Sequence, residues 1–124
     1  MPVELQQRGY GYQLLQGKSY TGWPPTASKT HCWYDDRELH ITLQLPPGKP
    51  AALRLHCVDG DGRGRQQRLI VQAKTIGEIE QFAGGKDIEV FLSPDETASG
   101  RIAIAIQRLA GPNAVVSTIE LLTP

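Results

Sequence analysis

The residues best suited to chemistry gather in one short stretch at the middle of the chain. Residues 58–68, VDGDGRGRQQR, bring together two carboxylates, three arginines and three glycines. Asp59 and Asp61 stand at alternate positions among glycines, as the oxygen ligands of a calcium loop do. The full EF-hand spacing is absent, because Ile70 stands where the twelfth-position glutamate would be. Arg65 would also bring positive charge close to such an ion.

Two other interpretations of this turn remain open. In the first, Asp59 or Asp61 accepts a bidentate hydrogen bond from Arg65, with Gln67 also holding the carboxylates, so that the turn is a locked structural corner. In the second, Asp59, Asp61 and Arg65 face outward and contact a ligand. We favour the corner and expect no metal here.

Aromatic side chains with a possible binding role precede residue 35 in the chain. Sugar recognition needs a flat apolar ring for the C–H face of a pyranose, with amides, carboxylates or guanidinium groups for its hydroxyls. Trp23 precedes two prolines in a predicted loop and is the better candidate for an exposed ring. Trp33 and Tyr34 are further candidates, although Trp33 also fits a core position. Asn113 follows Gly-Pro, where it either supports the turn or contacts a ligand.

Catalytic and metal-binding patterns are missing from the sequence. It contains no G-x-S-x-G, Walker, Rossmann or H-E-x-x-H motif, and no C-x-x-C pair. Cys57 shares the inward phase of its strand, which favours a buried free thiol, but a disulfide between Cys32 and Cys57 stays open. We therefore expect a protein that is not an enzyme and holds no cofactor.

The elements that would position these residues are β-strands. Period-two alternation predicts strands at 39–45, 52–58, 68–74, 88–92, 102–106 and 114–122, with turn signals between them. Residues 75–82 are ambiguous between a helical turn and an irregular crossover. With short edge strands in the first 31 residues, this pattern predicts an antiparallel β-sandwich or barrel of about eight strands. We expect a single domain, 1–124, with an irregular arm at 1–31 and the sandwich core at 32–122.

Charge and hydropathy exclude several classes of protein. Thirteen basic and thirteen acidic side chains cancel, so the chain lacks the basic surface of a nucleic-acid binder. No apolar run approaches the about 20 residues of a transmembrane helix, and no secretory signal begins this chain. We expect no membrane insertion and a monomer.

Four segments of the sequence together resemble a known family. They are Cys32-Trp33-Tyr34, the run from Leu53 through Asp59 to Gln67, Phe82 with Gly84-Gly85, and Gly111-Pro112-Asn113-Ala114-Val115-Val116-Ser117. Their joint spacing is similar to that of bacterial jelly-roll domains of the galactose-binding-like superfamily. The likeness extends over about residues 10–122.

This resemblance implies a non-catalytic accessory β-sandwich of the kind appended to secreted carbohydrate-active enzymes and surface proteins. The function expected from it is that of a carbohydrate-binding module, secreted or on a cell surface, with a covalently linked catalytic domain as a further partner. Its ligand contacts would be Trp23, Trp33, Tyr34, Asp59, Asp61, Arg65 and Asn113. The competing expectation is a structural or protein-interaction domain in which these residues serve only the fold.

Overall fold

The chain folds into β-sheets throughout the part that the computed structural model describes, which comprises residues 4–6, 12–20, 32–59 and 62–122. All regular secondary structure within these ranges is β-strand, and the strands form three sheets. No helix in these ranges is long and apolar enough to cross a membrane.

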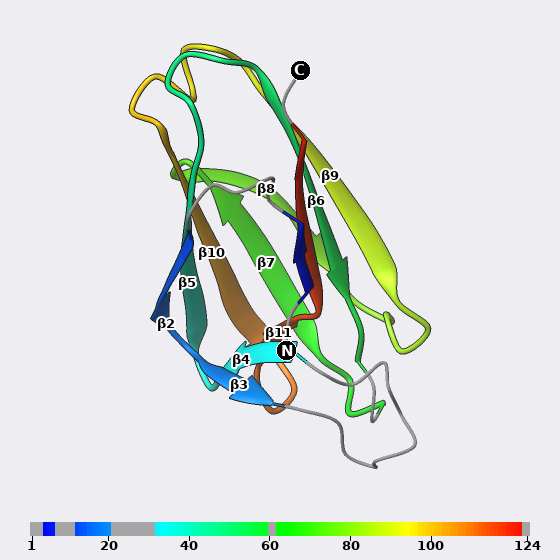
Figure 1. The fold of residues 1–124 in the computed structure, drawn as a ribbon. Coiled ribbons are helices and arrows are strands. Elements are labelled where there is room, and N and C mark those ends of the chain that lie inside the picture. Colours follow the sequence, from blue (N-terminus) through cyan, green and yellow to red (C-terminus); the bar gives the residue numbers. More distant parts are fainter. Residues whose placement is uncertain (1–3, 7–11, 21–31, 60–61, 123–124) are drawn as a thin grey trace.

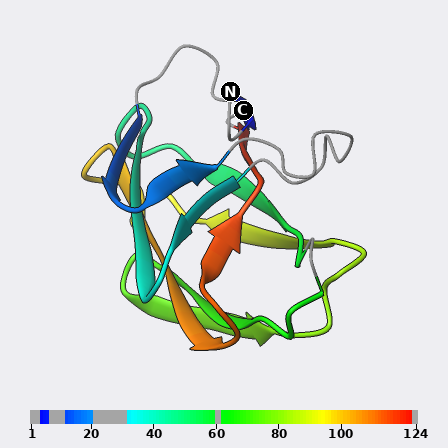
Figure 2. The ribbon, with the colours of Figure 1, turned by 90° about the horizontal axis from the view of Figure 1, so that it is seen from below.

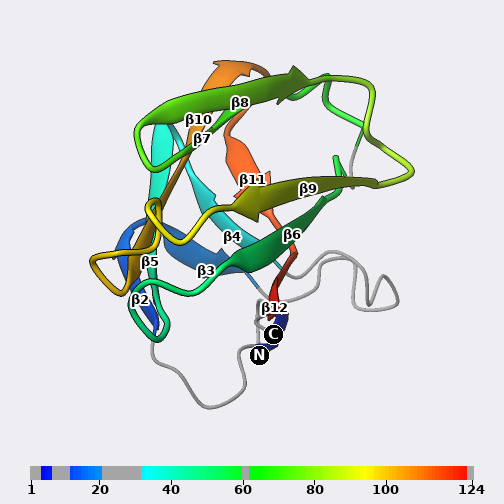
Figure 3. The same ribbon diagram turned by 90° about the horizontal axis from the view of Figure 1, so that it is seen from above.

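The two larger sheets face each other. Sheet A has the strand order β1 (Glu4–Gln6), β12 (Thr118–Leu122), β6 (Ala51–Cys57) and β9 (Lys86–Leu92). Sheet B has the order β2 (Tyr12–Gln16), β5 (Glu38–Gln44), β10 (Arg101–Ala110), β7 (Gln66–Val71) and β8 (Lys74–Ile79). Figure 3 shows β7, β8 and β10 on one side of the molecule, with β6 and β9 on the other. The described strand pairs are antiparallel except β1 with β12, which is parallel.

A third, smaller sheet lies at one end of the sandwich. Sheet C has the order β11 (Ala114–Val116), β4 (Cys32–Asp35) and β3 (Lys18–Tyr20). Figure 1 places these strands across the lower end of the molecule, and Figure 2 views that end directly. The turns after β6 and β10 lie at the same end. Asp59 and Arg65 of the charged turn are therefore positioned where sheet C meets the two larger sheets.

The core is built by the alternation that the sequence predicts. In β6 every second residue is buried, from Ala51 to Cys57, and β5 and β10 alternate in the same way. Burying one such leucine or isoleucine side chain stabilises the fold by about 1.5–3 kcal/mol. The strands contribute the following fully buried residues: Leu39, Ile41, Leu43, Leu53, Leu55, Ile102, Ile104, Ile106, Ile119 and Leu121. An all-β, antiparallel sandwich of the expected class is confirmed.

The prediction for residues 75–82 was wrong in both of its forms. Most of this segment belongs to β8, which pairs antiparallel with β7 and forms the edge of sheet B. Gln72 and Ala73, with φ angles of 51° and 62°, make a two-residue turn that sends the chain straight back. The Gln72 amide also donates to the carbonyl of Arg101 at 2.8 Å and accepts from Ala103 N–H at 2.9 Å. These bonds stabilise a backbone conformation that residues other than glycine rarely adopt.

The strands at the two ends of the chain are more divided than expected. The predicted strand 114–122 is split into β11 and β12, because the chain leaves sheet C at Ser117 and enters sheet A. Ser117 N–H donates to the His56 carbonyl at 2.8 Å at this crossing. The first 20 residues contribute β1, β2 and β3, each at a sheet edge, and these short strands raise the described total to twelve. Leu14 packs on the core, whereas Leu15 is 58% exposed.

Candidate functional site

Asp59 organises the charged turn from its inside. Its carboxylate is buried, and it accepts hydrogen bonds from the backbone N–H groups of Arg63 at 3.2 Å, Gly64 at 3.0 Å and Arg65 at 3.2 Å. Gly62 and Gly64 have positive φ angles of 62° and 74°, which curl the backbone so that these N–H groups converge. The glycines thus shape a loop around one carboxylate.

Arg65 connects this turn to a segment 48 residues further along the chain. Its Nη1 donates to Asp59 Oδ1 at 2.6 Å, and its Nε donates to Asn113 Oδ1 at 2.8 Å. The side chain is nearly buried, so the pair is shielded from solvent. Gly111 packs against the same arginine, because a Cβ built at Gly111 would lie 2.7 Å from the Arg65 Cα. The turn after β10 is thereby pressed onto the turn after β6.

The electrostatics of this corner favour a fixed ion pair. Burial desolvates the Asp59 carboxylate and opposes its ionisation, but hydrogen bonds from the Arg65 side chain and from the Arg65 and Arg63 backbone outweigh this and hold its pKa below the ordinary value. A carboxylate engaged in this way has its lone pairs occupied by N–H donors. These bonds favour the structural interpretation for Asp59, Arg65 and the half-buried Asn113, and a contact of these residues with a ligand stays a prediction.

The prediction that Gln67 also holds the carboxylates was wrong. Gln67 is 2% exposed, and its amide pairs with the main chain of Val115 in β11. Its Nε2 donates to the Val115 carbonyl at 2.8 Å, and its Oε1 accepts from the Val115 N–H at 2.9 Å. The alternation of β7 points Gln67 into the sandwich, so the side chain satisfies backbone groups that would otherwise be buried without partners.

The calcium hypothesis gains no support from the described residues. Among them no group of three or more His, Cys, Asp and Glu side chains is arranged to hold a metal ion. Asp61 lies outside the described residues, as does Trp23, the candidate for an exposed aromatic ring.

The aromatic candidates in β4 lie mostly inside. Trp33 is 4% exposed and belongs to the hydrophobic core, which confirms the core position that its sequence also fits, while a contact of its ring with a ligand stays a prediction. Its register explains the burial, because Trp33 pairs with Val116 where sheet C packs onto the sandwich. Tyr34 is half-buried and packs against the core. Burial of the large apolar ring stabilises the end of the sandwich, which outweighs any benefit of exposing it.

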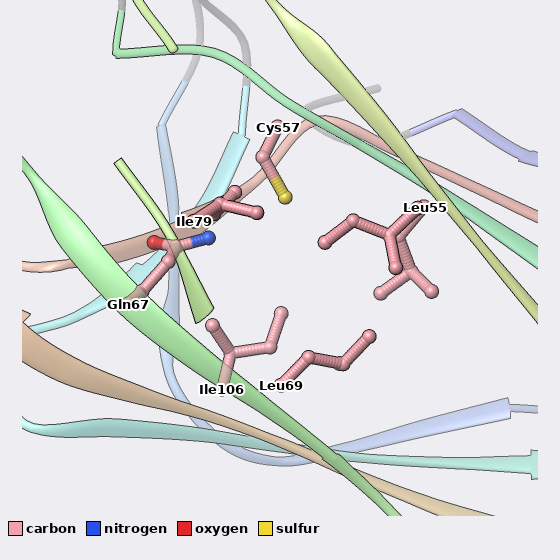
Figure 4. Close-up of a pocket in the computed structure, with 7 residues that line it drawn as sticks. Leu55, Cys57, Gln67, Leu69, Ile79 and Ile106 are labelled. Atoms are coloured by element: carbon pink, nitrogen blue, oxygen red, sulfur yellow. The ribbon is translucent and has the colours of Figure 1, made fainter. Parts of the chain in front are cut away.

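The pocket drawn in Figure 4 lies between sheets A and B. It leaves no room for a water molecule. Its lining is apolar apart from the Gln67 amide and the Cys57 thiol. Burial raises the pKa of Cys57 to about 12, so the thiol stays protonated. No disulfide joins Cys32 and Cys57, and the pocket is a packing gap in the core.

One exposed aromatic residue, Phe91, was not predicted as a candidate from the sequence. Phe91 in β9 is 75% exposed, while its neighbours Val90 and Leu92 are buried. The alternation of β9 carries the signal, because residues 88, 90 and 92 point inward and Phe91 must point outward. Phe91 therefore lies on the outer face of sheet A, far in the sequence from the aromatic residues that the prediction considered.

Comparisons with known proteins give matches in structure alone. No family model matches the sequence, and no curated protein matches it either. A family 61 carbohydrate-binding module solved with β-1,4-galactotriose is similar to 96% of this chain and 91% of its own, at 14% identity and a TM-score of 0.54. Family 35 carbohydrate-binding modules match over comparable lengths, one of them from Clostridium thermocellum.

Two further matches place the same fold inside longer chains. The extracellular domain of ANXUR2 from Arabidopsis thaliana is similar to 94% of this chain and 41% of its own, at 10% identity and a TM-score of 0.63. A family GH115 4-O-methyl-α-glucuronidase is similar to 90% of this chain and 17% of its own, at 8% identity and a TM-score of 0.57. The resemblance expected from the sequence is confirmed at the level of the fold: this chain has a β-sandwich fold like that of these carbohydrate-binding modules.

Proposed function

We propose that this domain is a non-catalytic carbohydrate-binding module. The observation that carries the proposal is the extent of the structural match, which includes nearly the whole of this chain and nearly the whole of several free-standing modules. The likeness is thus to a complete binding unit. The match supports sugar binding. Because one fold hosts many functions, the assignment depends on the test below.

A non-catalytic role agrees with the state of the polar side chains. Asp59 is engaged by Arg65, and the His56 imidazole lies 2.6 Å from the Asp87 carboxylate on the surface. A module of this kind works by holding its ligand, without forming or breaking bonds.

A catalytic domain linked to this one completes the proposal. The enzyme match in which this fold makes up a small part of a longer chain supports such an arrangement. Binding of the module to a polymer would raise the effective concentration of substrate at the linked domain. We infer a secreted or cell-surface location, where polymers of this kind are met.

A depletion assay on insoluble polysaccharides tests the function. The folded domain is mixed with a panel of plant and microbial cell-wall polymers, and the protein left in solution is measured. We expect depletion by at least one polymer, reversed by its soluble oligosaccharide. The predicted contacts stay predictions: Trp23, Trp33, Tyr34, Asp59, Asp61, Arg65 and Asn113. Alanine variants of Trp23, Tyr34 and Asn113 belong in the same assay. A folded domain that no polymer depletes would favour the structural or protein-interaction alternative.

A further inference from the structure

The outer face of sheet A presents side chains in a regular grid. Strand register places Leu122, Ala52 and Phe91 side by side in one row across β12, β6 and β9. The next row holds Glu120, Arg54 and Glu89, and the third holds Thr118, His56 and Asp87. With about 3.4 Å per residue along a strand and about 4.8 Å between strands, the grid measures about 14 Å by 10 Å. We call these nine residues the sheet A platform.

The first row supplies an apolar surface that the fold does not need. Phe91 is 75% exposed and Leu122 is 42% exposed, so neither owes its place to burial in the core. A phenylalanine exposed to this extent contributes little to the stability of the fold and leaves an apolar surface on an edge strand, where other molecules can associate. Its ring stands on a rigid strand, where it can meet the apolar C–H face of a sugar with little loss of side-chain entropy.

The second and third rows supply hydrogen-bonding groups held in place. Arg54 donates to Glu89 Oε1 at 2.8 Å and 3.0 Å, and its guanidinium also lies 3.9 Å from Glu120. His56 is fixed by its contact with Asp87 at 2.6 Å. These groups are partly exposed, so their remaining donors and acceptors can bond hydroxyls without a large change of conformation.

The charge of the platform selects among sugars. Three carboxylates stand against one guanidinium, and that guanidinium is already paired within the row. An anionic polymer such as a polyuronate would meet net repulsion here. Neutral sugar units offer hydroxyls that donate to the carboxylates and accept from Arg54.

We propose that the sheet A platform binds a chain of neutral hexose units, with the Phe91 ring stacked on one sugar face and the Arg54 row bonding the hydroxyls of the next. This inference rests on the proposed carbohydrate-binding function and assigns the site and ligand class within it.

Affinity electrophoresis through gels containing a soluble neutral β-galactan or galactomannan tests the assignment, with polygalacturonate as the anionic comparison. We expect the neutral polymers to slow the wild-type domain and Phe91→Ala to weaken that binding about tenfold. Leu15→Ala is the matched control, because Leu15 is also an exposed apolar residue but lies in β2 of sheet B. It should migrate like the wild type in every gel.

The outcomes separate the site from the function. If a neutral polymer slows the wild type and Phe91→Ala equally, or if Trp23→Ala alone abolishes the effect, the platform is refuted and the function stands. Retardation by polygalacturonate alone overturns the neutral ligand class. If no polymer slows the wild type, both proposals fail, and concentration-dependent self-association lost in Phe91→Ala would then identify the platform as a contact between copies.

Discussion

Asp59→Ala should destabilise the domain well beyond what a surface substitution does. The change leaves the Arg65 guanidinium and N–H buried without their carboxylate partner. Removing one member of a buried ion pair costs about 3–5 kcal/mol. The Arg65 Nε keeps its bond to Asn113, and the exposed Arg63 and Gly64 N–H groups can turn to water. We therefore expect the lower end of the range, about 3 kcal/mol.

Urea unfolding followed by tryptophan fluorescence measures this loss. For a chain of this length, a decrease of about 3 kcal/mol also lowers the melting temperature by about 12 °C. Glu89→Ala is the matched control, because it removes a carboxylate from an exposed arginine pair and should cost less than about 1 kcal/mol.

A double-mutant cycle isolates the ion pair itself. Arg65→Ala combined with Asp59→Ala should cost less than the sum of the two single changes, because neither charge is then left alone. A loss below about 1 kcal/mol for Asp59→Ala, or simple additivity in the cycle, would refute the view that this pair locks the corner.

Three further predictions follow from the same structure. The pKa of Asp59 is lowered in the folded protein, so the ionised Asp59 stabilises the fold fully above the ordinary carboxyl pKa range, and this stabilisation is lost as the pH falls through the folded pKa. The difference in unfolding free energy between wild type and Asp59→Asn should therefore shrink in acid. A difference that does not change with pH would contradict the pairing. Gly111→Ala places a Cβ against the Arg65 backbone, whereas Gly48→Ala has a similar φ but open space around its Cβ. We expect Gly48→Ala to cost about 1 kcal/mol of stability and Gly111→Ala to cost several times more. Equal melting temperatures of the two variants would argue against the clash. Cys57 should resist thiol reagents at pH 8 until the domain unfolds, and rapid titration of both cysteines in the native state would contradict its burial.

Period-two alternation was enough to predict the core. In β5, β6 and β10 the inward residues are apolar and the outward ones polar or small, so the buried face is visible from the sequence alone. The edge strand β8 was missed because it is almost wholly exposed and its register shifts between Leu69 and Ile70. The turn before it relies on positive φ at Gln72 and Ala73, and no glycine marks it.

The candidate site was predictable only in part. Charge and glycine content located the corner correctly, but the bond from Arg65 to Asn113 joins segments 48 residues apart and leaves no local pattern. Trp33 suits a sugar site by residue type, yet its register in sheet C buries it. Phe91 could have been identified as exposed from the inward phase of residues 88, 90 and 92, because alternation along the strand then points residue 91 outward.

A glycan array probed with the folded domain tests the central claim most directly. We expect saturable binding confined to a small set of glycans, with neutral hexose chains among them, and competition by the same glycan free in solution. If the domain is folded by circular dichroism and binds no glycan on the array, the claim is contradicted. This β-sandwich would then be a structural or protein-interaction domain.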